Sequence, residues 1–226
     1  MIKYIPVVFT GIACFIAWVI MLRDYKKWNI ATETDDMEMH IKSSYKGMMI
    51  YAIVMSITTI VEAVIFCGRY SDYGAVHNLK RLLLLSIMWP IAYIDFKTFR
   101  IPNSYIILGL VYRGIILLFE FINGGNDLKS ILISELIAAG ALLLATVLCA
   151  ICIKNSIGFG DIKLFVVMGL MLGTEGVWNA VFLSLIVSFV IAGFLLITKK
   201  KGRKDFIPFG PAIAIGTYLS ICLTGV

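Results

Sequence analysis

The chain has 226 residues, of which 60% are hydrophobic and only 15% are charged, and its mean hydropathy is +0.94. This composition excludes an ordinary soluble domain, in which about a quarter of the residues are charged. The net charge of +6 requires no nucleic acid, because basic loops at a membrane surface account for it. We therefore expect an all-α integral membrane protein, since a backbone in lipid must satisfy its hydrogen bonds within helices.

Apolar runs recur along the whole chain and predict a polytopic bundle of about eight transmembrane helices. In chain order, the predicted spans are residues 4–22, 47–67, 79–95, 103–122, 130–153, 161–174, 176–198 and 207–225. The third and sixth spans have only short unbroken apolar cores, so we expect them to tilt or to line a thinner region. The longest polar segment, residues 23–46, is too short for a soluble domain.

Basic residues divide unevenly between the two sides of this topology. Lys and Arg gather in the segments that follow the first, third, fifth and seventh spans, including the run from Lys199 to Lys204. Because short cytoplasmic loops collect positive charge, this side is predicted to be cytoplasmic. Both termini are then outside, in a multi-pass protein of the cell membrane.

Two aspartates lie at the edges of predicted spans. Asp95 ends the third span in WPIAYIDFKTFRIPN, and Asp161 begins the sixth in GFGDIKL. An ionisable group at such a position is costly, and the predicted topology puts both on the cytoplasmic face. Two carboxylates at one depth can share a proton and activate a water, as aspartic proteolysis requires. The alternative is that each merely ends or caps a helix, a common use of Asp.

The glycines beside Asp161 favour the catalytic interpretation. Gly158 and Gly160 have no side chains, so an extended peptide could approach the backbone closely at this point. Packing alone does not require that arrangement.

Three motifs together resemble the type IV prepilin peptidases, including the related preflagellin peptidases. They are D-x-x-x-x-R-I-P-N beginning at Asp95, GFGDIKL, and IPFGP from Ile207 to Pro211, in this order. The resemblance implies a membrane aspartyl endopeptidase that removes a short basic leader from prepilin-like precursors at the cytoplasmic face. It implies Asp95 and Asp161 as the catalytic pair. The residues expected to bind substrate or shape the site are Pro102, Asn103, Gly158, Gly160, Lys163, Phe209, Gly210 and Pro211.

The resemblance also implies the organisation and the partners of the chain. Residues 1–226 would form a single membrane peptidase domain, with N-terminal spans and a cytoplasmic loop in 1–78 and the catalytic core in 79–226. The expected partners are a prepilin-like precursor, the lipid bilayer, and pilus or secretion assembly components.

The cysteines depart from the pattern of many bacterial members of this family. Those members carry two Cys-x-x-Cys pairs in the first cytoplasmic loop, associated with zinc and with N-methylation of the new amino terminus, whereas residues 23–46 contain no cysteine. Cys149 and Cys152 have metal-like spacing, but one pair within a helix without His indicates packing. We therefore expect no metal, no cofactor and no N-methyltransferase activity.

Helix ends suggest roles for the two acids. Asp161 is predicted at a helix N-terminus, which favours its anion, and Asp95 near a C-terminus, which does not. This indicates Asp161 as general base and Asp95 as general acid. Lys97 and Lys163, each two residues from an Asp, either tune the pair or extend to lipid phosphates.

The chain has two further groups of charged residues. The segment TETDDMEMH, residues 32–40, either attracts a basic leader or is simply a solvated loop. Four ionisable residues within the spans are interpreted as interhelical pairing groups: Glu62, Arg113, Glu120 and Glu135.

The sequence leaves three other classes of membrane protein open. Signal-peptide-peptidase and presenilin-type proteases also use Gly-x-Gly-Asp, but they expect Tyr-Asp and Pro-Ala-Leu where this chain has Ile94-Asp95 and Phe209-Gly210-Pro211. A proton-coupled transporter would use paired acids nearer the midplane. A catalytically inactive scaffold of a secretion apparatus is the third alternative.

Overall fold

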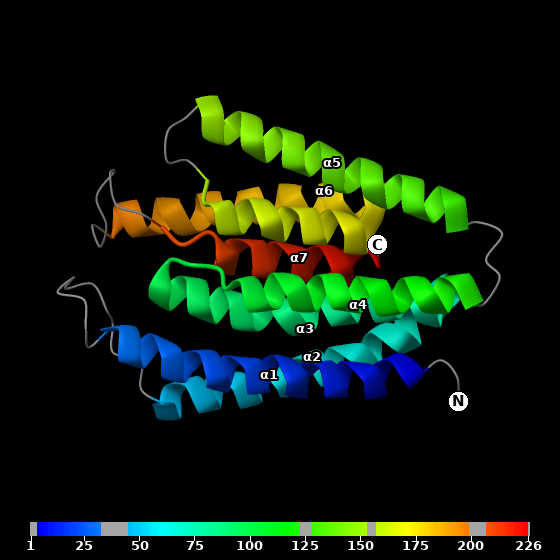
Figure 1. Cartoon of the computed structure of the whole chain (residues 1–226), viewed down its shortest axis with the longest axis horizontal. Coiled ribbons are helices and arrows are strands. Elements are labelled where there is room, and N and C mark those ends of the chain that lie inside the picture. Colours follow the sequence, from blue (N-terminus) through cyan, green and yellow to red (C-terminus); the bar gives the residue numbers. More distant parts are fainter. Residues whose placement is uncertain (1–3, 33–44, 123–127, 153–156, 199–206, 226) are drawn as a thin grey trace.

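The computed structural model describes residues 4–32, 45–122, 128–152, 157–198 and 207–225, and within them the chain forms seven α-helices and no strand. The helices are α1 (Ile5–Thr32), α2 (Tyr45–Arg69), α3 (Ala75–Thr98), α4 (Asn103–Ile122), α5 (Leu128–Cys152), α6 (Phe159–Ile197) and α7 (Gly210–Thr224), with a 3₁₀ turn at Ser71–Tyr73. They lie side by side as one elongated bundle (Figure 1). The predicted all-α fold is confirmed.

Five helices are long and apolar enough to cross a membrane: α1 as far as Asp24, α2, α4, α5 and α6. The apolar helix α7 is shorter. This pattern is that of a multi-pass membrane protein. Helix α1 continues to Thr32, well beyond the predicted end at residue 22, so the polar segment 23–46 begins as helix. The acidic residues of TETDDMEMH lie outside the described residues, which resume at 45.

Helix α6 contains both the sixth and the seventh predicted spans. Its backbone leaves the helical conformation at Gly173, where φ is +67°, a value that glycine adopts without steric cost. The two halves of α6 run side by side in opposite directions (Figure 1). Ser134 of α5 accepts the N–H of Thr174 at 3.0 Å and caps the second half. The count of eight helices is therefore not confirmed, because no separate loop divides these two spans.

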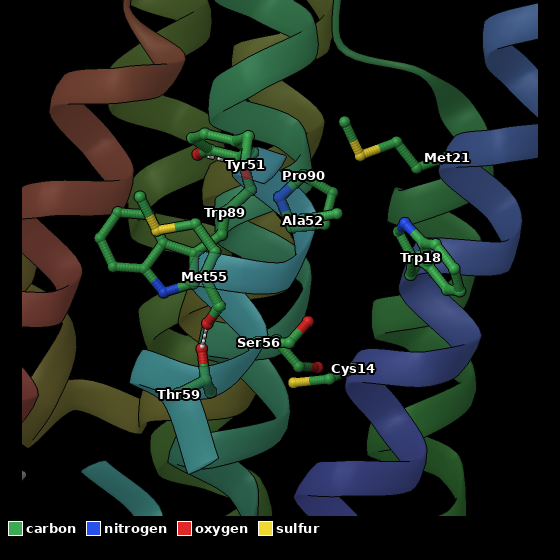
Figure 2. A pocket seen from close by; sticks show the side chains of 11 residues that line it. Cys14, Trp18, Met21, Tyr51, Ala52, Met55, Ser56, Thr59, Trp89 and Pro90 are labelled. Atoms are coloured by element: carbon green, nitrogen blue, oxygen red, sulfur yellow. Dashed lines mark hydrogen bonds between the residues drawn. The ribbon is translucent and has the colours of Figure 1, made fainter. Parts of the chain in front are cut away.

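Helix α3 is the centre of the bundle. It packs against α1, α2, α4, α6 and α7, and every residue from Leu82 to Met88 is buried. Figure 2 shows a small pocket between α1, α2 and α3, beside Trp89 and Pro90 of α3. Its volume of about 20 Å³ has room for about one water. Neither Asp95 nor Asp161 lines it.

Buried charges join α3, α4 and α5. Lys80 Nζ lies 2.7 Å from Glu135 Oε1 and 3.1 Å from Glu120 Oε1. Arg113 Nη2 lies 2.6 Å from Glu135 and 2.9 Å from Glu120. Glu62 of α2 accepts a hydrogen bond from Cys222 Sγ of α7 at 2.8 Å. The predicted interhelical pairing of these acids and of Arg113 is confirmed.

Candidate active site

The end of α3 and the beginning of α6 lie at the same end of the bundle (Figure 1). Helix α3 ends at Thr98 because Phe99 takes the left-handed conformation, with φ at 52°, and donates its N–H to the Asp95 carbonyl at 2.9 Å. Pro102 then disfavours a helical conformation at Ile101. Asp95 is thus held in the last turn of the central helix.

The carboxyl group of Asp95 contacts the start of α7. Its Oδ2 accepts the N–H of Gly210 at 2.7 Å, and the side chain is only 5% exposed. A Cβ at Gly210 would lie 2.8 Å from both Cβ and Oδ2 of Asp95. Only glycine allows this approach, which brings the positive end of the α7 dipole to a buried carboxylate.

Asp161 lies in the first turn of α6. Its Oδ2 accepts the N–H of Gly158, the residue that precedes the helix, at 3.2 Å. This bond is one half of a capping box. Asp161 is half-buried. The end of α3 and the start of α6 bring the two acids to the same end of the bundle.

The segment between α3 and α4 packs against the start of α6. A Cβ at Gly160 would lie 2.9 Å from Cβ of Ile101, so this glycine is required for a contact within the protein. That differs from the predicted use of Gly160, which was to leave room for a substrate. Lys163 Nζ donates to Asn103 Oδ1 at 3.0 Å, and Pro102 accepts the N–H of Tyr105 at 3.3 Å.

The third motif completes the cluster. Phe209 precedes α7 and contacts Phe165 of α6, with ring centroids 6.0 Å apart. Pro211 occupies the first turn of α7, where its missing N–H costs no helical hydrogen bond. All three motif segments thus meet at one end of the bundle.

Sequence reasoning missed one acid in this region. Asp24, near the end of the apolar part of α1, is 5% exposed and accepts the hydroxyl of Ser104 at 2.7 Å. Beside Arg23 in a polar segment, it has the pattern of a solvated residue, and no sequence signal points to its burial. Among the described residues, no group of three or more His, Cys, Asp or Glu side chains could hold a metal ion.

Similarity to known proteins identifies the family of the chain. The sequence profile of the type IV leader peptidase family matches residues 82–197, a range that includes Asp95 and Asp161. The chain belongs to the type IV leader peptidase family. The resemblance found from its motifs is therefore confirmed.

The relatives share the name prepilin leader peptidase/N-methyltransferase. The protein of this name from Bacillus subtilis (strain 168) is 28% identical over 162 residues, which cover 71% of this chain and 62% of the relative. The protein from Aeromonas salmonicida (strain A449) is 26% identical over 174 residues, 76% of this chain and 57% of the relative. The protein from Legionella pneumophila is 27% identical over 179 residues, which cover 76% of this chain and 58% of the relative. The match thus spans about three fifths of each relative. No solved structure matches the chain.

Proposed function

We propose that this family member is a membrane aspartyl endopeptidase that removes the leader peptide from prepilin-like precursors. The observation that carries the proposal is that the end of α3 and the start of α6 bring Asp95 and Asp161 to one end of the bundle, where the three motif segments meet. The family and the names of the relatives support the substrate class.

The proposed reaction uses the pair and one water. The ionised carboxylate takes a proton from the water as its oxygen attacks the scissile carbonyl, and the protonated carboxyl donates to the developing oxyanion. The carboxyl group that took the proton from water then donates it to the leaving amine as the C–N bond of the tetrahedral intermediate breaks, and the other carboxylate regains its proton from the hydroxyl that becomes the new carbonyl. Each carboxyl already accepts one backbone N–H, which fixes its orientation before substrate arrives.

The site is proposed to face the cytoplasm, with both termini outside. The basic segments at the same end of the predicted topology support this orientation. A precursor whose basic leader precedes an apolar helix would then place its scissile bond at the membrane surface, beside the acids. Pilus or secretion assembly components are the further partners we propose.

The chain is proposed to lack N-methyltransferase activity, the second activity in the name of its relatives. Residues 23–46 contain no cysteine, whereas the resemblance associates N-methylation with two Cys-x-x-Cys pairs in this loop. The expected product is a cleaved protein with an unmethylated amino terminus.

The test is cleavage of a prepilin-like precursor co-reconstituted with the protein in liposomes, read by mass and by N-terminal sequencing. We expect cleavage by the wild type and its loss in Asp95→Asn and Asp161→Asn. The matched control is Glu62→Gln, which alters a buried acid of α2 outside the three motifs. This variant should still cleave the precursor. Cleavage by both Asn variants would refute the pair. Proton-coupled flux without cleavage by the wild type would favour the transporter instead.

A further inference from the structure

Asp24 of α1 is a buried acid that contacts the start of α4. Its Oδ2 accepts the Ser104 hydroxyl at 2.7 Å, and its Oδ1 lies 3.4 Å from Nε of Arg23. Both carboxylate oxygens therefore have partners. The short hydrogen bond from Ser104 therefore links α1 to the start of α4.

The segment that Asp24 holds is the one that packs against α6. Ser104 directly follows Asn103, which accepts Lys163 Nζ at 3.0 Å. Ile101, at the other end of the segment, fills the space beside Gly160. Gly160 and Lys163 flank Asp161 in sequence. A continuous set of contacts thus leads from Asp24 through residues 101–104 to the first turn of α6.

Two other hydrogen bonds join α1 and α4 among the described residues, and the one from Tyr112 lies farther along both helices. Tyr105 donates its hydroxyl to the Ala17 carbonyl at 3.1 Å, and Tyr112 donates to the Ala13 carbonyl at 3.3 Å. Tyr112 lies about two helical turns beyond Ser104. It provides a comparison in which the same two helices are linked without contact with the 101–104 segment.

We propose that Asp24 is a positioning residue for the peptidase reaction. By holding residues 101–104 against the start of α6, it fixes the position of Asp161 relative to Asp95. This inference rests on the proposed function. It concerns a residue outside the range 82–197 that the family profile matches.

The kinetic test compares Asp24→Ala, Ser104→Ala and the double variant in the cleavage assay. Because a misplacement of about 1 Å at a reacting group can cost on the order of 100-fold, we expect kcat to fall roughly ten- to a hundredfold. KM should stay within about twofold, because neither side chain binds substrate. The kcat of the double variant should be no lower than that of the slower single variant. Asp24→Asn and Ser104→Thr, which keep an acceptor and a donor, should recover most of the loss.

The matched control is Tyr112→Phe, which removes an α1–α4 hydrogen bond away from the site. We expect it to lower thermal stability about as much as Ser104→Ala while leaving kcat unchanged. An equal loss of kcat in Tyr112→Phe would overturn the inference, since any weakening of the α1–α4 contact would then suffice. Full kcat in Asp24→Ala would overturn it as well.

A second readout does not depend on cleavage. With the native cysteines replaced, Ile101→Cys and Gly160→Cys place two thiols where residues 101–104 meet the start of α6. Their rate of oxidative cross-linking reports how persistently the segment stays there, while the bond between Asn103 and Lys163 is kept. We expect several-fold slower cross-linking when Asp24→Ala is added. An unchanged rate would contradict the positioning role. If the wild type cleaves no precursor, the proposed function fails, and the cross-linking result still shows whether Asp24 holds the segment.

Discussion

Asp95 lies at two helix ends at once. It is in the last turn of α3, where the dipole disfavours an anion, and its carboxyl accepts the N–H of Gly210 at the start of α7, where the dipole favours one. Asp161 lies only at the start of α6. The ends of α3 and α6 alone favour Asp161 as the general base. The start of α7 favours an anion at Asp95 as well, so the helix ends do not distinguish the two acids, and the acid and base roles belong to the pair.

Gly210→Ala tests the contact between Asp95 and α7. The added Cβ would lie 2.8 Å from Asp95 Cβ and Oδ2, closer than real Cβ contacts allow, so the carboxyl must move. We expect kcat to fall on the order of 100-fold, with the protein still folded by circular dichroism. Gly140→Ala, where a Cβ meets nothing within 4 Å, should retain wild-type activity. Equal activity in the two variants would mean that the position of Asp95 is not critical.

At the scale of the elements, the buried charges of α3, α4 and α5 form one ionic cluster, consisting of Lys80, Arg113, Glu120 and Glu135. Each basic residue contacts both acids. Breaking a buried pair by removing one partner is costly because it leaves an uncompensated charge. This cluster fixes α5, which packs mainly on α6, relative to the central helix.

Glu135→Leu removes the acid with the two shortest contacts in this cluster. We expect a loss of about 3–5 kcal/mol in the free energy of unfolding, measured by denaturation in detergent micelles. The matched control, Lys129→Gln, alters an exposed charge on the same helix and should change the stability by less than about 0.5 kcal/mol. A loss in Glu135→Leu no larger than in the control would show that the cluster contributes nothing net.

Helix boundaries follow the sequence where an apolar run ends in a turn-forming residue. The prediction of 103–122 coincides with α4, which begins just after Pro102. Helix α1 continues beyond its predicted span of 4–22 because polar residues from Arg23 onward extend the helix to Thr32, past the apolar part that ends at Asp24. The predicted boundary between the spans 161–174 and 176–198 lies beside the break at Gly173, where one residue at positive φ takes the place of a loop.

At the scale of the whole molecule, the sequence predicted the fold class, the family and the position of Asp95 and Asp161 at one end of the bundle, and the catalytic role of the two acids stays a prediction. It did so because apolar length, charge and motif order are local properties. It could not predict the bond between Asp95 and Gly210 or the burial of Asp24. These depend on partners 115 and 80 residues away along the chain, which only the packing of α1, α3, α4 and α7 brings together.

The proposed orientation predicts which residues reagents can reach. Ile122 ends α4 and Phe159 begins α6, at opposite ends of the bundle (Figure 1), and both are highly exposed, at 77% and 84%. With the native cysteines replaced, a membrane-impermeant maleimide added to intact cells should label Ile122→Cys. It should label Phe159→Cys only after lysis. The reverse pattern would place the acids outside the cell and contradict the orientation.

The central claim is that Asp95 and Asp161 act as one catalytic unit. Its most direct test is kcat/KM for precursor cleavage by Asp95→Asn, Asp161→Asn and the double variant. Residues that act as a unit are strongly non-additive. We predict that each single variant loses at least about a thousandfold and that the double variant loses no more than either. Losses that multiply in the double variant, or a single variant that retains activity, would show that the two acids do not form a pair.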